Sequence, residues 1–104
     1  MSRVFSGIQP SGELHLGNYL GAVKNWAALQ HAHPSIFCVV DYHAITGAYD
    51  PDSLRRRRHD MALSIIAAGV EPGTATLFMQ SAVPEHTELA WIFNSVTPLG
   101  ELER

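Results

Sequence analysis

The sequence predicts an α/β fold, namely the first half of a doubly wound parallel sheet with flanking helices. Three short apolar runs alternate with three longer segments of helical periodicity, which is the pattern of parallel strands joined by crossover helices. The middle run is apolar at all five positions, 36–40, as expected for a strand buried on both faces. A chain of 104 residues has room for one domain, 1–104, with its own core.

The first strand, loop and helix are predicted within residues 3–34. Arg3–Ser6 is centred on apolar residues and is expected to be a strand. Three glycines and Pro10 predict a loop over Gly7–Gly17. Apolar side chains recur with helical spacing from Asn18 to Gln30, and Pro34 ends that helical region.

The second helix has a start and a stop signal. Asp41 ends the buried strand, and Asp50 followed by Pro51 predicts a capped helix start. Gly69 is expected to end the helix. Between these signals one apolar stripe is expected, formed by Leu54, Met61, Ile65 and Ile66.

The third unit repeats the pattern. A strand is expected over Thr74–Met79, and a helix that opens at 83–85 and ends near Pro98 and Gly100. One face of that helix is apolar, with Leu89, Ile92, Phe93 and Val96. The final residues, ELER, are expected to be a cut within a longer protein.

A glycine-rich segment follows the first strand, where open parallel sheets bind their ligands. Residues 5–21 hold four glycines together with Gln, His, Asn and two Ser. Gly17 and Asn18 fall at the predicted helix start, where free N–H groups attract phosphate. The segment has neither the lysine of a Walker A loop nor GxGxxG spacing. Phosphate charge would therefore be met by backbone N–H groups, His15, Asn18 and hydroxyls.

Six segments in order resemble the tryptophanyl enzymes of the class I aminoacyl-tRNA synthetase family. HLGN at 15–18 resembles the HIGH signature of that class. The other matching segments are IQPSG at 8–12, NYLGA at 18–22, VVDYHAIT at 39–46, FMQSAVPEH at 78–86 and GELER at 100–104. The resemblance implies that residues 1–104 are the N-terminal part of a Rossmann-like (HUP-type) catalytic domain.

The resemblance also implies a reaction and its site. Tryptophan would be activated by ATP, which carries Mg²⁺, and then passed to tRNA(Trp). His15 and Asn18 would be the catalytic residues, donating hydrogen bonds to phosphate oxygens. The implied ATP site consists of Gln9, Pro10, Ser11, His15, Gly17 and Asn18, with Gly17 against adenine. The implied tryptophan pocket consists of Phe5, Gly7, Gln9, Val40 and His43. Asn18 replaces the second histidine of the family and cannot supply a cationic imidazole.

Two other interpretations stay open. One is a tyrosyl-type or other adenylyl-transferring enzyme with an HxGH loop. The other is a noncatalytic, truncated paralogue that binds nucleotide. The family's second signature, KMSKS, is absent from these 104 residues. We therefore expect the isolated chain to bind ATP weakly and to be inactive alone.

Charge and composition narrow the remaining possibilities. A net charge of -3 argues against a dedicated nucleic-acid module. The six histidines show no HxxxH or HExxH spacing, and Cys38 is the one cysteine, so no metal site and no disulfide are expected. No apolar run approaches the roughly 20 residues of a membrane helix, and a cytoplasmic location is expected. The resemblance implies a homodimer, which the apolar third helix also suggests.

Charged residues outside the loop are expected to be structural. Arg55–Arg58 cannot share one helix face, because successive residues turn by about 100°. We expect a solvated face, with Arg58 on the apolar stripe and paired with an acid. Asp41 is expected to make a structural hydrogen bond.

Overall fold

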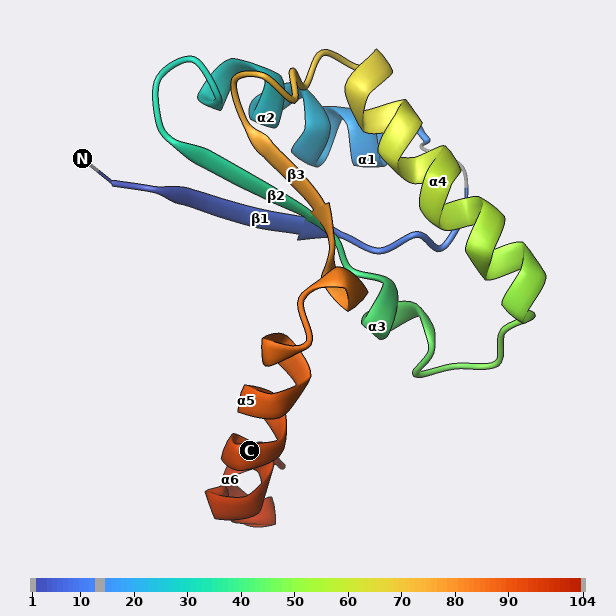
Figure 1. Cartoon of the computed structure of the whole chain (residues 1–104), viewed down its shortest axis with the longest axis vertical. Helices are drawn as coiled ribbons and strands as arrows, with labels where there is room; N and C mark the ends of the chain where they lie inside the picture. The colour runs from blue at the N-terminus through green and yellow to red at the C-terminus, as the bar shows by residue number, and fades with distance from the viewer. Residues whose placement is uncertain (1, 13–14, 104) are drawn as a thin grey trace.

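Three parallel strands form one sheet in the order β1–β2–β3 in the computed structural model, which describes residues 2–12 and 15–103 (Figure 1). The strands are β1 (Val4–Ile8), β2 (Ser35–Val39) and β3 (Thr76–Met79). Cys38 of β2 lies opposite Gly7 on one side and Phe78 on the other. The predicted parallel α/β fold is confirmed. The predicted start of the loop at Gly7 is wrong, because Gly7 belongs to β1 and pairs with Cys38 of β2.

The first crossover is a continuous helical segment that contains a π-helical turn. A helix over 18–30 without such a turn was predicted. It comprises α1 (Leu16–Asn18), a π-helical turn (Tyr19–Val23) and α2 (Lys24–Leu29). Its inner face is buried through Val23, Trp26 and Gln30, which are spaced as helical neighbours. Residues 13–14 of the predicted loop lie outside the described residues.

The second crossover contains α4 (Pro51–Ala67), which begins and ends as predicted. The Asp50 carboxylate accepts a hydrogen bond of 2.8 Å from the Ser53 amide, so it caps the helix. Beyond the helix, Gly69 has φ of 110°, a conformation that favours glycine. Both predicted boundary signals are therefore confirmed.

The core lies between one face of the sheet and the two crossover helices. Trp26 stacks on Phe37 with ring centroids 4.6 Å apart, and Met61 and Ile65 of α4 belong to the same buried cluster. Ile66 was predicted to join them but is 41% exposed. It lines an open groove with Leu77, Phe78 and Met79 of β3.

A helical arm, residues 85–102, extends away from the sheet (Figure 1). It consists of α5 (Glu85–Val96) and α6 (Leu99–Leu102), and neither helix has a buried residue. The four residues of the predicted apolar face of α5 are exposed, by 52% to 72%. α5 ends at Val96, just before Pro98, as predicted. Gly100 was not expected inside a helix, but it lies within α6, for which Pro98 is the N-cap.

Two further short elements follow the strands. They are α3 (Asp41–Ala44) after β2 and a 3₁₀ turn (Gln80–Ala82) after β3. Neither was predicted, since a single turn has no periodic pattern to detect. Within residues 2–12 and 15–103, no helix combines the length and the apolar character required to cross a membrane.

Candidate functional site

The carboxyl ends of the three strands meet at one edge of the sheet, as parallel pairing requires. β1 continues into Gln9–Ser11, β2 into α3, and β3 into the 3₁₀ turn Gln80–Ala82. This edge is where open α/β sheets bind ligands. Most of the sequence-predicted site residues lie on the first two of these connections.

The Gln9–Ser11 loop lines a cavity of about 290 Å³. The Ser11 amide donates to the Gln9 carbonyl over 2.9 Å, which makes a tight turn. Pro10 is buried and Ser11 is exposed. The rest of the lining comes from the α3–α4 connection and from Leu54 and Arg57 of α4. The loop predicted to bind ATP therefore borders open space at the strand ends.

His15 caps the helix that starts the first crossover. Its Nδ1 accepts hydrogen bonds from the amides of Gly17, at 3.1 Å, and Asn18, at 3.4 Å. An imidazole nitrogen that accepts carries no proton, so the neutral ring has its proton on Nε2. His15 is exposed, and Nε2–H is the ring donor available to a ligand.

Gly17 lies directly beneath the His15 ring. A Cβ added to Gly17 would lie 3.1 Å from Cε1 and 3.2 Å from Nδ1 of that ring. The glycine thus lets the ring approach the helix start. Two of the backbone N–H groups predicted to meet phosphate already bond to His15, so a phosphate there must compete with that ring or use other donors.

Phe5 and Gly7, two of the residues predicted for tryptophan, lie on the face of the sheet opposite the core, whereas Gln9 lines the cavity beside α4. Phe5 and Gly7 alternate with the inward-facing Ile8 and Val4, and Phe5 is 62% exposed. A Cβ on Gly7 would lie 2.9 Å from Cγ1 of Val40, so these two residues are packed together. The structure thus places Gly7 against Val40, and Phe5 projects from the same side of β1 as Gly7. His43 is exposed on α3, three residues beyond Val40.

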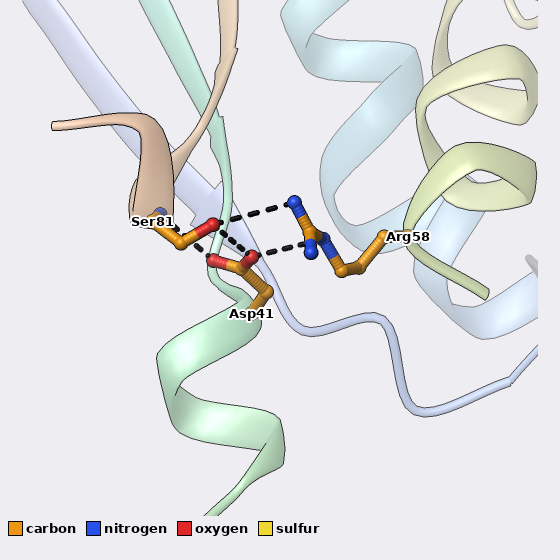
Figure 2. Close-up of polar contacts among 3 residues, drawn as sticks. All are labelled: Asp41, Arg58 and Ser81. Carbon is orange, nitrogen blue, oxygen red and sulfur yellow. Dashed lines mark hydrogen bonds and ion pairs between the residues drawn. The ribbon is translucent and has the colours of Figure 1, made fainter. Parts of the chain in front are cut away.

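A polar cluster around the buried Asp41 lies beyond the carboxyl ends of β2 and β3 and was only partly predicted (Figure 2). We call Asp41, Arg58 and Ser81 the Asp41 cluster. The Asp41 carboxylate accepts from the Ser81 amide at 3.0 Å and from its hydroxyl at 2.6 Å. Arg58 Nε lies 3.0 Å from Asp41 Oδ2, and the guanidinium also donates to Ser81 Oγ at 3.3 Å.

Two expectations bear on this cluster. The structural role of Asp41 and the pairing of Arg58 with an acid are confirmed. Ser81 was not predicted. It follows the apolar strand β3, which ends at the same edge of the sheet as β2, and this position could have indicated a contact with Asp41. The cluster also acts on its neighbour Cys38: burial, and then the Asp41 charge, raise the pKa of that thiol to about 11.

The other arginines of the run point to different surroundings, as the 100° helical turn predicts. Arg55 pairs with Asp52 over 3.6 Å at the exposed surface, and Arg56 donates to Ser53 Oγ over 3.4 Å. Arg57 does not belong simply to a solvated face, because it lines the cavity beside the Gln9–Ser11 loop. Among residues 2–12 and 15–103, no group of three or more His, Cys, Asp or Glu side chains is arranged to hold a metal ion.

Comparison with known proteins identifies close relatives over the whole chain. The family described as tRNA synthetases class I (W and Y) matches residues 1–104. A tryptophan–tRNA ligase of Deinococcus radiodurans is 56% identical over 100% of this chain and 33% of its own length. One of Bacillus anthracis is 53% identical, with 32% of its length covered. The chain thus spans about a third of the length of these curated relatives.

Solved structures give the same result for the fold. The tryptophanyl-tRNA synthetase of Campylobacter jejuni, complexed with ADP and tryptophan, matches 99% of this chain and 32% of its own, with a TM-score of 0.92 and 38% identity. The enzyme of Mycoplasma pneumoniae has a TM-score of 0.94, also at 38% identity, over 100% of this chain and 31% of its own. A tyrosyl-tRNA synthetase of Archaeoglobus fulgidus, at 24% identity and a TM-score of 0.77, shares the fold.

Proposed function

We propose that this chain, which belongs to the class I tRNA synthetases of the tryptophan and tyrosine type, is the ATP-binding third of a tryptophan–tRNA ligase. The observation that carries the proposal is the open cavity lined by Gln9, Pro10 and Ser11 at the carboxyl edge of the sheet. It lies where this fold class binds nucleotides. The 56% identity to a tryptophan–tRNA ligase favours tryptophan as the amino acid.

The proposed reaction has two steps. The carboxylate of tryptophan attacks the α-phosphate of ATP, forming tryptophanyl-adenylate and releasing pyrophosphate. The 2′- or 3′-hydroxyl of tRNA(Trp) then takes the tryptophanyl group and AMP leaves. The protein supplies position and hydrogen bonds to the developing charge, and no side chain need act as acid or base.

We assign the nucleotide to the first connection of the sheet. Gln9, Pro10 and Ser11 would line the ATP site together with Gly17. His15 Nε2–H and the Asn18 side-chain amide would donate to phosphate oxygens. The donor set fits a triphosphate, since it consists of neutral N–H and O–H groups beside an open cavity that Arg57 also lines. Mg²⁺ would enter with the triphosphate and screen its charge.

We assign tryptophan to the uncovered face of the sheet. The exposed Phe5 ring and the contact between Gly7 and Val40 give an apolar surface for an indole. Gln9 and His43 would border it. The exposed apolar side chains of the helical arm suit a homodimer, and the lone buried thiol of Cys38 suits the reducing cytoplasm.

A chimera tests the assignment of the amino acid. Residues 1–104 replace the matching third of the Deinococcus radiodurans ligase, and ATP–pyrophosphate exchange is measured with tryptophan and with tyrosine. We expect exchange with tryptophan, and a loss of about 100-fold on His15→Ala because a phosphate donor is removed. A folded chimera that exchanges only with tyrosine, or not at all, contradicts the proposal.

The isolated chain provides a second test. Titration with Mg-ATP, followed by amide NMR, is expected to shift residues 9–11 and 15–18 with weak affinity. Aminoacylation by these 104 residues is expected to be negligible, since they contain no KMSKS segment. Turnover above about 1 per second would overturn this assignment of the chain as one part of the active site.

A further inference from the structure

The Asp41 carboxylate is buried and yet fully partnered. The residue is 4% exposed, and its two oxygens meet the Ser81 amide, the Ser81 hydroxyl and Arg58 Nε. A buried carboxylate without partners is strongly unfavourable, so these contacts must form together. They connect three segments that are far apart in the chain: the start of α3, the middle of α4 and the 3₁₀ turn after β3 (Figure 2).

Asp41 is also directly joined to the proposed tryptophan-binding wall. It follows Val40, whose amide donates to the Ile8 carbonyl over 2.9 Å and whose side chain packs against Gly7. The His43 amide donates to the Val40 carbonyl over 3.2 Å. Because Val40 and His43 lie on either side of Asp41, a shift of the carboxylate shifts both of them.

We infer that the Asp41 cluster positions one wall of the amino-acid pocket, by fixing the Val40–His43 turn relative to β3 and α4. The inference rests on the proposed function and deepens it. Asp41 touches no substrate in this arrangement and is a positioning residue. Arg58 and Ser81 act through it, one from each neighbouring segment.

A role in stability alone is the competing explanation, and the two explanations differ in which substrate they affect. The Arg58 side chain is 33% exposed, and a partly exposed ion pair is expected to contribute only modest net stability. Among the described residues, no hydrogen bond or ion pair joins Gln9, Pro10 or Ser11 to the cluster. Loosening the cluster should therefore weaken tryptophan use more than ATP use.

The test uses the Deinococcus chimera after its own exchange activity has been established. Asp41→Asn is expected to raise the KM for tryptophan about 10-fold, since a small misplacement of a pocket wall is sufficient. The KM for ATP should change less than about twofold. Arg58→Met should behave like Asp41→Asn, and Arg58→Lys should recover part of the loss because it keeps a cation near Asp41.

The matched control is Arg55→Met, on the same helix. Arg55 pairs with Asp52 at the exposed surface, with side chains 73% and 75% exposed, and should leave both KM values unchanged. If Asp41→Asn fails to fold, Ser81→Ala replaces it, because that variant keeps the backbone N–H bond to Asp41; about a threefold rise in the KM for tryptophan is expected.

Two results separate the inference from the function on which it rests. An inactive parent chimera counts against the proposed function and is seen before any variant is made. An active parent, with unchanged KM for tryptophan in Arg58→Met and in Asp41→Asn or Ser81→Ala, overturns the positioning role even if thermal stability falls. Equal rises in both KM values also overturn it, since they indicate a general loosening.

Discussion

The sheet body, residues 2–12 and 15–83, and the helical arm, residues 85–102, carry similar apolar sequences with opposite outcomes. In the sheet body Trp26 and Phe37 stack in a closed core, with exposures of 3% and 0%. In the arm Trp91 and Phe93 are 74% and 57% exposed. Helical periodicity therefore specifies a helix and its apolar face. Whether that face is buried depends on a second apolar surface that packs against it.

The largest expected difference between the two regions is the loss of stability when an aromatic side chain is replaced by alanine. Phe37→Ala should lower the free energy of unfolding by about 3–5 kcal/mol, because it removes a stacked ring and leaves a cavity. Phe93→Ala, the matched change in the arm, should alter it by less than about 0.5 kcal/mol. Urea unfolding of the chain, followed by circular dichroism, measures both. Similar losses in the two variants would show that the arm packs on something in solution.

A second pair of variants compares two glycines. Gly69→Ala should cost about 1–2 kcal/mol, because φ of 110° disfavours a side chain and the new Cβ would lie 3.3 Å from the Ala27 Cβ. Gly100→Ala in α6 meets open space and should be neutral or stabilising by up to about 1 kcal/mol, as expected for glycine within a helix. Thermal melts of the two variants give the sign of each change in stability. A stabilised Gly69→Ala variant would contradict the positive φ of Gly69.

A third and smaller effect on stability is expected from the side-chain cap of α4. Helix α5 has no such cap, because its N-cap residue is Pro84. The backbone hydrogen bond from Ser53 lowers the pKa of the Asp50 carboxyl. A lowered folded-state pKa stabilises the fold above the unfolded pKa of about 3.9, and this contribution disappears as the pH falls through the folded-state value.

Asp50→Ala should therefore lower the melting temperature slightly at neutral pH and leave it unchanged near pH 2, after protonation of the wild-type carboxyl. Asp50→Asn is the control, because asparagine also caps helices but does not titrate. Its melting temperature should stay near that of the wild type at neutral pH. A pH-independent effect of Asp50→Ala would argue against the charged cap.

The smallest expected effect on stability belongs to Trp91→Phe, which should be close to neutral. Its use is spectroscopic, because Trp26 and Trp91 are the two tryptophans of the chain. Trp91→Phe leaves the buried Trp26, and emission should move to shorter wavelength and resist quenching by acrylamide. Trp26→Phe leaves the exposed Trp91 and should give the reverse. Strong protection of Trp91 would reveal an occupied surface on the arm.

Local signals predicted most of the sheet body. The Asp50–Pro51 start and the Gly69 stop were readable because capping and positive φ depend on single residues. The π-helical turn, α3, α6 and the 3₁₀ turn were missed. The prediction for Ile66 was wrong, since the helical stripe does not reveal that β3 leaves a groove beside it.

The site was predictable in its location and less so in its contacts. Sequence placed Gln9, Pro10 and Ser11 at a strand end, and the structure has a cavity there. It gave no indication that His15 would accept from Gly17 and Asn18, because a cap of this kind depends on the ring's rotamer. The partnership of Asp41 with Ser81 joins residues 40 positions apart, and no local pattern encodes that distance.

That separation has a consequence for the order in which the molecule matures during synthesis. The chain emerges from the ribosome with its amino end first, so Asp41 appears well before Ser81. Until β3 and the turn after it have been translated, the carboxylate has Arg58 as a possible partner but no hydroxyl or amide from that turn. The nascent two-stranded unit therefore lacks the two Ser81 contacts to Asp41, and they can form only after the third strand has joined the sheet.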